Sequence, residues 1–470
     1  MSGSQPTLHR TAATASGIYA APADPAALLA RHDRPGPRYT SYPPANLWRD
    51  DVGPADLAAA LAHVGARGEP LALYAHFPFC AAKCLYCGCN ATVTRHARVV
   101  DDYLDDLERE LDGVGDALGG RAPALQLHWG GGTPNFLSDA QLARAAALFA
   151  TRFAFAPGAE WSVECDPRLV TPSQLATLRA AGFTRLSYGV QDLDGDVQRA
   201  IGRPQDEALV RAAVAAARDA GFAGLNLDLM YGLPQQDDAT FAATLDAAID
   251  MRPERLAVFG YAHVPWLKAH QKRIDAGALP DATARFALWR LAVERLVEAG
   301  YRWIGLDHFA LPDDPLTVAF DAGTLHRNFM GYTTMDAPHL VGVGCSAISD
   351  VDGLYAQGDP KLGAWRTLVR AGTLPVVRGW RLSPDERRLR SAITRLMCDL
   401  ALPLAALGDD APAARARLAP LVDDGCVTLD DDVLRVTPLG RWFLRTACMA
   451  IDPMLARPRD WEAPAWSRAV

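Results

Sequence analysis

The hydrophobic pattern changes rhythm from about residue 71, where short β-rich runs begin to alternate with longer amphipathic stretches. Compact runs rich in aliphatic and aromatic residues predict buried strands, and apolar positions recurring every three to four residues predict helices. The expected strands are 71–77, 125–131, 161–165, 185–191, 225–232 and 256–263, and the expected helices include 99–114, 139–153, 206–222 and 238–251. Gly182 and Gly221 stand where helix C-caps favour glycine. Six such units predict parallel βαβ structure, either a barrel or an open doubly wound sheet.

The strand rhythm fades after about residue 285. Residues 284–301 have a helical apolar stripe, and residues 306–360 are expected to be irregular. Two further helices, 385–400 and 432–451, flank a small hairpin, and "DDGCVTLDDDVLRVTPLGRWFL" resembles a winged-helix unit whose acidic flanks oppose contact with DNA. The expected division is an N-terminal arm (1–54), a barrel domain (55–285) and a mainly helical C-terminal domain (286–470).

Composition narrows the class of protein. The 470 residues carry a formal net charge of −8, which argues against a nucleic-acid surface. No apolar run reaches the ~18 residues of a membrane span, and the start of the chain has neither the basic nor the apolar region of a secretory signal. Five of the nine cysteines are scattered singly among apolar neighbours, so a reducing, cytoplasmic setting without a disulfide framework is expected.

Chemically useful residues stand at or near the carboxyl ends of five predicted strands. They are Gly130 to Thr133, Glu164, Gln191, Asp228, and Ala262 with His263. In parallel α/β folds this edge of the sheet carries the active site. Any one of these residues taken alone is more simply an ordinary loop residue, but five strands delivering them to one edge favour a functional site.

The stretch "FPFCAAKCLYCGCN" holds four cysteines in the spacing C-x3-C-x2-C-x-C: Cys80, Cys84, Cys87 and Cys89. Structural zinc sites use pairs of ligands on separated knuckles. So short a loop wraps three sulfurs around one face of a metal centre more easily than four. Three thiolates on a four-iron cluster leave one iron open to another ligand. An iron–sulfur cluster is therefore favoured, with zinc or structural thiols as the alternatives.

The C-x3-C-x2-C spacing resembles the cluster motif of radical S-adenosylmethionine (SAM) enzymes. From about residue 35 to 455, nine stretches in order resemble the oxygen-independent coproporphyrinogen III oxidases, among them "GPRYTSYPPA", "LHWGGGTPNFL", "NLDLMYGLPQQ" and "LHRNFMGYTT". The resemblance implies a partial (β/α)6 barrel and a [4Fe-4S] cluster on Cys80, Cys84 and Cys87. It also implies two molecules of SAM and a deoxyadenosyl radical.

That family converts two propionate side chains of coproporphyrinogen III to vinyl groups by oxidative decarboxylation, giving protoporphyrinogen IX in haem biosynthesis. The resemblance therefore implies this activity, a low-potential electron donor of the flavodoxin or ferredoxin type, and a monomer that binds neither nucleic acid nor membrane. A haem chaperone and a relative that modifies porphyrin or haem rings are the rival functions. Cys89, absent from the chaperone motif, favours the decarboxylase.

The resemblance also assigns site residues one by one. Those for the first SAM are Tyr74, Tyr86 beside the cluster, Gly131, Gly132 and Thr133 of the "GGGTP" turn, Glu164, and Ile348. Those for the second SAM are Gln191, Arg203, Asp228 and Ala262, and Cys89 is the candidate catalytic residue. Core aromatics, a tight turn and surface ion pairs are the simpler interpretations of the same residues.

Contacts to the substrate carboxylates must come from local cations, because the chain is net acidic and charges are screened beyond ~8 Å. The candidates are Arg38, His308, His326 and Arg327. Lone arginines and satisfied histidines are the simpler alternative. Two departures from the family pattern, Tyr188 where methionine is expected and Cys165 where an aliphatic residue is usual, flank site positions without occupying them.

Overall fold

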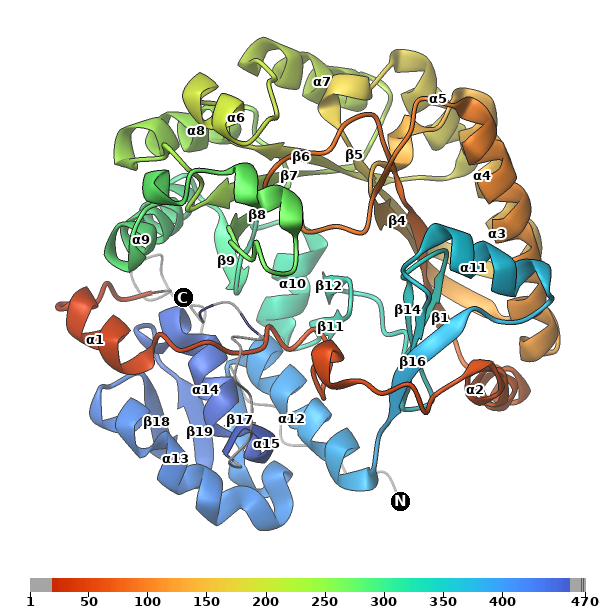
Figure 1. Ribbon diagram of the computed structural model, residues 1–470. Coiled ribbons are helices and arrows are strands. Elements are labelled where there is room, and N and C mark those ends of the chain that lie inside the picture. The colour runs from red at the N-terminus through yellow and green to blue at the C-terminus, as the bar shows by residue number, and fades with distance from the viewer. Residues whose placement is uncertain (1–18, 457–465, 467, 469–470) are drawn as a thin grey trace.

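The centre of the molecule is a curved sheet of six parallel strands with helices on its outer side (Figure 1). A computed structural model gives the structure of residues 19–456, 466 and 468. The strands are β1 (Leu71–Phe77), β4 (Pro123–Gly131), β5 (Ala154–Cys165), β6 (Arg185–Gln191), β7 (Gly224–Tyr231) and β8 (Arg255–Gly260). The helices between them are α3 (Ala97–Leu118), α4 (Asp139–Arg152), α5 (Pro172–Ala181), α6 (Gly195–Ala200), α7 (Glu207–Asp219) and α8 (Asp238–Asp250). The predicted (β/α)6 barrel is confirmed.

The sheet continues well past residue 285, so the expectation of an irregular stretch over 306–360 is wrong. Beyond β8 lie the antiparallel strands β10 (His308–Ala310) and β9 (Arg302–Gly305), and beyond β1 lie β13 (His339–Val343), β14 (Ile348–Val351), β15 (Leu354–Gly358) and β16 (Val376–Arg381). These strands are short, and β10 and β13 join the sheet by pairing with the distant strands β8 and β1, which local pattern does not reveal. The division at residue 285 stays a prediction, and the twelve-stranded sheet runs across it.

The C-terminal region packs beside the open side of the sheet (Figure 1). It comprises α12 (Pro384–Asp399), β17 (Ala401–Pro403), α13 (Ala411–Asp423), β18 (Val427–Asp430), β19 (Val433–Val436), α14 (Leu444–Ala450) and α15 (Pro453–Ala456). The helix predicted over 432–451 is wrong in its first half, because Asp431 and Asp432 adopt left-handed φ values of 49° and 59° and turn the chain into β19. The helical part begins with a 3-10 turn, Gly440–Phe443.

The described part of the predicted arm spans the gap between the C-terminal region and the far edge of the sheet. It contains α1 (Pro25–His32) and leads into α2 (Pro54–Arg67). Tyr39 and Tyr42 each donate a hydrogen bond of 3.0 Å to the carboxylate of Asp452. Arg49 exchanges two backbone hydrogen bonds with Gly379 of β16. The first 18 residues of the predicted arm lie outside the described residues.

The remaining helices complete the outer layer and the rim. They are α9 (Ala282–Glu298), α10 (Pro315–Ala322) and α11 (Leu362–Arg370). Gly182 ends α5 with a left-handed φ of 109°, as the sequence predicts, and Gly221 follows α7 with a φ of 82°. Among the residues that the structure describes, no helix is long and apolar enough to cross a membrane.

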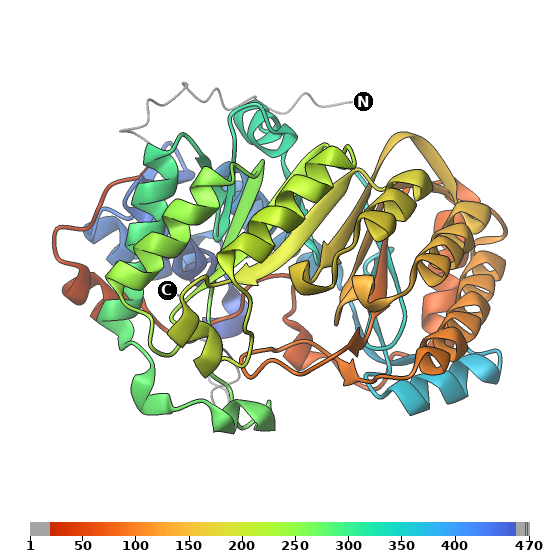
Figure 2. The ribbon, with the colours of Figure 1, turned by 90° about the horizontal axis from the view of Figure 1, so that it is seen from above.

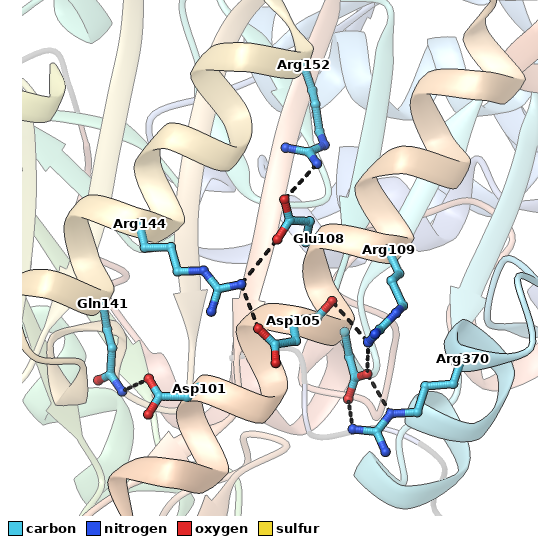
Figure 3. A network of polar contacts seen from close by, with 9 residues as sticks. Asp101, Asp105, Glu108, Arg109, Gln141, Arg144, Arg152 and Arg370 are labelled. Atoms are coloured by element: carbon cyan, nitrogen blue, oxygen red, sulfur yellow. Dashed lines mark hydrogen bonds and ion pairs between the residues drawn. The ribbon is translucent and has the colours of Figure 1, made fainter.

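Ion pairs join α3, α4 and α11 on the outside of the barrel (Figure 3). Asp106 of α3, whose side chain has no exposed surface, accepts hydrogen bonds from Arg109, Arg366 and Arg370 at 2.7–3.0 Å. Since α11 lies between β15 and β16 in the chain, the carboxylate of Asp106 connects these outer strands of the sheet to α3, the first helix of the barrel.

Candidate active site

The four-cysteine loop leaves the carboxyl end of β1. It passes through the short strand β2 (Phe79–Cys80), which pairs with β3 (Thr92–Val93) as the chain returns toward α3. The Cys84 side chain is buried, Cys80 and Cys87 are half-buried, and Cys89 is exposed; all four thiols are free. The Sγ atom of Cys80 lies 3.3 Å from the hydroxyl of Thr133, which follows β4.

Side chains from distant segments hold the backbone of this loop. His76 donates from Nε2 to the carbonyl oxygen of Asn90 over 2.8 Å, and His270 does the same to Cys87 over 2.8 Å. The amide of Gln271 donates to the carbonyls of Tyr86 (2.9 Å) and Ala262 (3.3 Å). The segment after β8 therefore fixes the cysteine loop and the end of β8 together.

The cysteines do not form a single-ion site. Within the described residues, no three His, Cys, Asp or Glu side chains stand close enough to hold one metal ion. Zinc needs its ligands within about 2.0–2.3 Å of one ion. A four-iron cluster instead takes one thiolate at each ligated iron, so its sulfur ligands stand apart. Hydrogen bonding from Cys89 lowers the pKa of the Cys87 thiol, which favours the thiolate that binds iron. The donor set fits the cluster and disfavours zinc.

The backbone at the end of β4 approaches the cysteine loop closely because glycines at this place have no side chain. A Cβ atom added to Gly131 would lie 2.9 Å from the ring of His76, and one added to Gly132 would lie 2.8 Å from the carbonyl oxygen of Phe79. Gly131 also has a left-handed φ of 119°. Only glycine allows this close approach of the two backbones.

Glu164, at the end of β5, lies on the face of the strand opposite the buried Val163 and Cys165. Its side chain is 46% exposed although β5 lies in the middle of the sheet. It accepts hydrogen bonds from Nε2 of His128 (3.2 Å) and the amide of Gly131 (3.3 Å). Burial opposes ionisation, but these bonds outweigh it and keep the pKa of Glu164 below its usual value. Tyr74 stacks on His128 with 6.0 Å between the rings. A charged carboxylate thus stands beside the glycine turn.

A second group of candidates surrounds Arg203. Nη1 of Arg203 lies 3.3 Å from Asp166 and 3.5 Å from Sγ of Cys84, and Nη2 donates to the carbonyl of Gly189. Its Nε atom is buried and has no hydrogen-bond partner within the described structure. Gln191 ends β6 in the left-handed region, with φ 70°. An unpartnered guanidinium N–H at this place suits a carboxylate ligand.

Asp228 of β7 accepts hydrogen bonds from Ser187 (3.2 Å) and Asn226 (2.7 Å). Burial, followed by the negative charge of Glu164, raises the pKa of Asp228 to about 6. The two carboxylates therefore face the same space from β5 and β7, and a ligand that donates hydrogen bonds to both would relieve their repulsion.

Ile348 opens β14 and packs with Trp48, Tyr355 and Leu382. Its backbone lies against Gly342 of β13, which pairs with Tyr74 of β1. Ala262 follows β8 and takes part through its carbonyl oxygen, which Gln271 holds.

The candidate substrate contacts divide into two places. Arg38 and His308 both bind Asp307, at 3.4 and 2.8 Å. The two terminal nitrogens of Arg327 donate hydrogen bonds to the carbonyls of Tyr39 and Arg38, so Arg327 holds the arm in place. His326 and Arg327 line a cavity of about 370 Å³ between the arm, α12 and the hairpin of β11 (His326–Asn328) and β12 (Gly331–Thr333).

Sequence reasoning missed several polar residues near these groups. They are His76, His128, Ser162, Ser187 and Asn226 on the strands and, outside the strands, His270, Gln271 and Asp307. Four of them, His76, His128, Ser162 and Asn226, stand two residues from another candidate position on the same strand, the spacing at which strand side chains face one side. That alternation was a usable signal. His270 and Gln271 carry no such local pattern.

A three-cysteine loop after the first strand of a partial barrel is the arrangement of radical SAM enzymes, and residues 74–248 match the Radical SAM superfamily. Residues 382–443 match the HemN C-terminal domain. The oxygen-independent coproporphyrinogen III oxidase of Escherichia coli is 41% identical over 91% of this chain and 95% of its own length, and that of Synechocystis is 39% identical over 95% and 98%. The solved structure of coproporphyrinogen III oxidase from Escherichia coli, described as a radical SAM enzyme, matches 89% of this chain and 98% of its own with a TM-score of 0.84 at 40% identity.

The chain belongs to the oxygen-independent coproporphyrinogen III oxidase family. It is thus an oxidoreductase of the radical SAM class, whose members use a [4Fe-4S] cluster and SAM. The thiol set, the glycine turn and the unpartnered Nε of Arg203 fit these groups.

Proposed function

We propose that this protein decarboxylates two propionate side chains of coproporphyrinogen III to vinyl groups without oxygen, giving protoporphyrinogen IX for haem biosynthesis. The observation that supports this most is the meeting of the cysteine loop with Glu164, Arg203 and Asp228 around one hollow, in a chain that matches its oxidase relatives over nearly their whole length. When bound, the cluster and SAM supply the 5′-deoxyadenosyl radical that removes a hydrogen atom from each propionate.

Cys80, Cys84 and Cys87 would hold the cluster by three of its irons. Burial of the Cys84 side chain and the hydrogen bonds from His76 and His270 to the loop backbone keep the thiols in place. Tyr86 lies within the same loop, held through its carbonyl by Gln271, and would shield one side of the cluster.

The first SAM would lie over the turn of Gly131, Gly132 and Thr133. The ionised Glu164 beside this turn suits the ammonium and ribose groups. Tyr74 donates its hydroxyl to Nδ1 of His76 over 3.1 Å, which fixes both rings along this wall. Ile348 would supply an apolar contact from β14.

Nε of Arg203, next to Gln191, would bind the carboxylate of the second SAM. Asp228 would accept hydrogen bonds from the ribose hydroxyls of the same molecule. A donor bound to Asp228 would lower the raised pKa of that carboxyl and restore its charge. Ala262 would line the far side. Cys89, exposed next to the hydrogen-bonded Cys87, would serve the reaction as a proton or electron relay.

The substrate would present its carboxylates to Arg38 and His308. Both side chains already neutralise Asp307, whose pKa is held at about 2 by His308 and Arg38 in spite of burial. In the cavity beneath the arm, His326 and the unpartnered Nε of Arg327 would offer a second carboxylate contact. We assign the protein to the cytoplasm, as a monomer reduced by a flavodoxin or ferredoxin.

The test is anaerobic incubation of the reconstituted, dithionite-reduced protein with SAM and coproporphyrinogen III. Protoporphyrinogen IX and 5′-deoxyadenosine should form together, with carbon dioxide released. Haem bound tightly without turnover would instead indicate a chaperone, and a product of increased mass would indicate a ring-modifying enzyme. Absence of both expected products would refute the proposal.

A further inference from the structure

The lysines of this chain are few and collected in one region. Of the 47 basic residues only four are lysines: Lys83, Lys268, Lys272 and Lys361. Lys83 lies between Cys80 and Cys84. Lys268 and Lys272 lie in or beside the 3-10 helix η5 (Ala269–Arg273). Lys361 directly precedes α11.

Each lysine is within three residues of a group that touches the cysteine loop. His270 and Gln271 of η5 bind the carbonyls of Cys87 and Tyr86. The side chain of Asn90 donates to the carbonyl of Pro360, next to Lys361, over 2.9 Å. Figure 2 shows the green segment of η5, the orange cysteine loop and the blue α11 along the same edge of the molecule.

These charges are not used to hold the fold together. The ion pairs of the described structure are made by arginine and histidine, and no lysine takes part in one. The one described lysine side-chain hydrogen bond runs from Lys83 to the carbonyl of Cys89, over 3.4 Å. Lysine is a mobile, hydrated point charge, which suits weak and electrostatically steered contacts better than fixed bidentate pairs.

The same edge is free of competing negative charge over long stretches. Residues 70–100 and 255–274 contain no Asp or Glu, in a chain that has 55 of them. The nearest acidic residues along the chain include Asp275 and Asp359, and both accept backbone hydrogen bonds, at 2.9 and 2.8 Å. The segments that carry Lys83, Lys268 and Lys272 are therefore free of acidic side chains on a protein that is negative as a whole, whereas Lys361 precedes α11, which packs on the acidic helix α3.

Two large apolar side chains are exposed at the start of the segment that carries Lys268 and Lys272. Trp266 is 55% exposed and Leu267 is 67% exposed, directly before Lys268. An exposed tryptophan surrounded by mobile cations is typical of a protein-binding surface, since aromatic anchors carry binding energy and the charged rim sets partner and on-rate. A small carboxylate ligand would need the cations but not this apolar pair.

We propose that Trp266, Leu267, Lys83, Lys268, Lys272 and Lys361, here called the lysine edge, form the docking surface for a small acidic protein that carries a low-potential electron. The inference rests on the proposed function, which needs such a donor. Docking there brings the partner against the loop of Cys87 without blocking the hollow that faces SAM. The partner's flavin hydroquinone loses one electron and becomes the semiquinone, and the cluster gains that electron; no other group is transferred.

Binding of oxidised flavodoxin, an acidic FMN protein, tests the proposal. Immobilised flavodoxin is titrated with the anaerobically reconstituted protein by biolayer interferometry. Lys272→Glu should weaken binding about tenfold at ~0.03 M salt, and the difference should shrink toward zero at ~0.5 M salt. Trp266→Ala should weaken binding at both salt concentrations. The matched control is Arg435→Glu, an equal charge change at an exposed position of β19.

Dithionite needs no docking surface, so the dithionite-driven yield of 5′-deoxyadenosine should be the same in all these variants. Equal flavodoxin binding by Lys272→Glu and Arg435→Glu would overturn the proposal. So would a raised KM for coproporphyrinogen III in the Lys272→Glu variant, or binding to anionic vesicles in place of flavodoxin. Failure of the unaltered protein to turn over with dithionite would refute the proposed function and leave the binding result to decide the docking surface.

Discussion

Nη1 of Arg203 lies 3.5 Å from the Sγ atom of Cys84, so the arginine proposed for the second SAM also touches a cysteine proposed for the cluster. The same nitrogen lies 3.3 Å from Asp166, and Asp166 is bound in turn by Arg168. The two cofactor regions are thereby joined through one buried guanidinium, which keeps a positive charge beside the thiol.

Replacing Arg203 by methionine should separate these roles. Asp166 keeps Arg168, so the fold should lose only about 1–3 kcal/mol. Bound SAM should fall by one molecule per chain in equilibrium dialysis, while iron stays near four per chain, and product formation should fall about 100-fold. Arg199→Ala, at an exposed position on α6, is the control. Two SAM molecules retained at full affinity in the methionine variant would contradict the assignment.

Asp228 predicts a pH-dependent stability in the protein without cofactors. Its folded-state pKa of about 6 exceeds the ordinary value of 3.8, so the folded state holds a proton that the unfolded state releases. This stabilisation is complete below pH 3.8 and is lost as pH rises through 6. Between pH 4.5 and 7 the unaltered protein should therefore lose about 2 kcal/mol of its free energy of unfolding through Asp228, and Asp228→Asn should not show this loss. Urea unfolding at the two pH values measures the difference. The variant should be more stable at pH 7 and bind SAM more weakly.

Replacing Cys87 should remove the cluster, whereas replacing Cys89 should lower activity and leave the cluster in place. Cys87→Ser should abolish the cluster, giving iron and sulfide contents far below four per chain. Cys89→Ser should keep the cluster, because the other three thiols remain, but lower decarboxylation about 100-fold, as removal of a proton-transfer group does. Loss of iron in the Cys89 variant would make that residue a ligand.

Gln271 should control how firmly the cysteine loop is held. It is 1% exposed and makes hydrogen bonds with Tyr86, Ala262 and the amide of Val264. Gln271→Leu leaves these groups unpaired, so a chelator should remove the cluster about tenfold faster. The loss of the cluster is measured by the decay of its visible absorption. Gln141→Leu, at a buried amide between α3 and α4, is the matched control and should leave that rate unchanged (Figure 3).

Asp106 should matter for stability and not for chemistry. Removing a buried charge that three arginines share should cost about 3–5 kcal/mol in Asp106→Asn, measured by urea unfolding. Asp112→Asn breaks an exposed ion pair with Arg152 and should cost about 1 kcal/mol or less. Equal losses in the two variants would mean that burial does not decide the strength of this network.

The sequence predicted the barrel well because its strands are long, carry regular runs of buried apolar residues and are spaced by strongly patterned helices. β1 and β6 begin and end at the predicted residues, 71–77 and 185–191. The added strands escaped prediction because β9 to β15 span only three to five residues each, and because β10 and β13 join the sheet by pairing with β8 and β1, which lie far away in the chain. Local pattern carries no information about such partners.

The candidate site divides in the same way. The cysteines could be predicted from their motif spacing, and the strand-end carboxylates from the direction of the strands. His270 and Gln271 could not be predicted, since their contact with the cysteine loop depends on how the segment after β8 folds back across it. The neighbours that set the pKa of Asp228, Glu164 among them, likewise become visible only when the strands are side by side.

The pairing of β1 with β13 sets an order of events during synthesis. β1 lies between β4 and β13, so one of its edges stays bare until His339 to Val343 have been made. Translation adds about 5–20 residues per second, so His339 follows Phe77 by roughly 13–50 s. The strand that carries the cysteine loop is therefore among the first to emerge and among the last to be enclosed. Iron bound before residue 343 is made would meet a loop whose strand still has one bare edge.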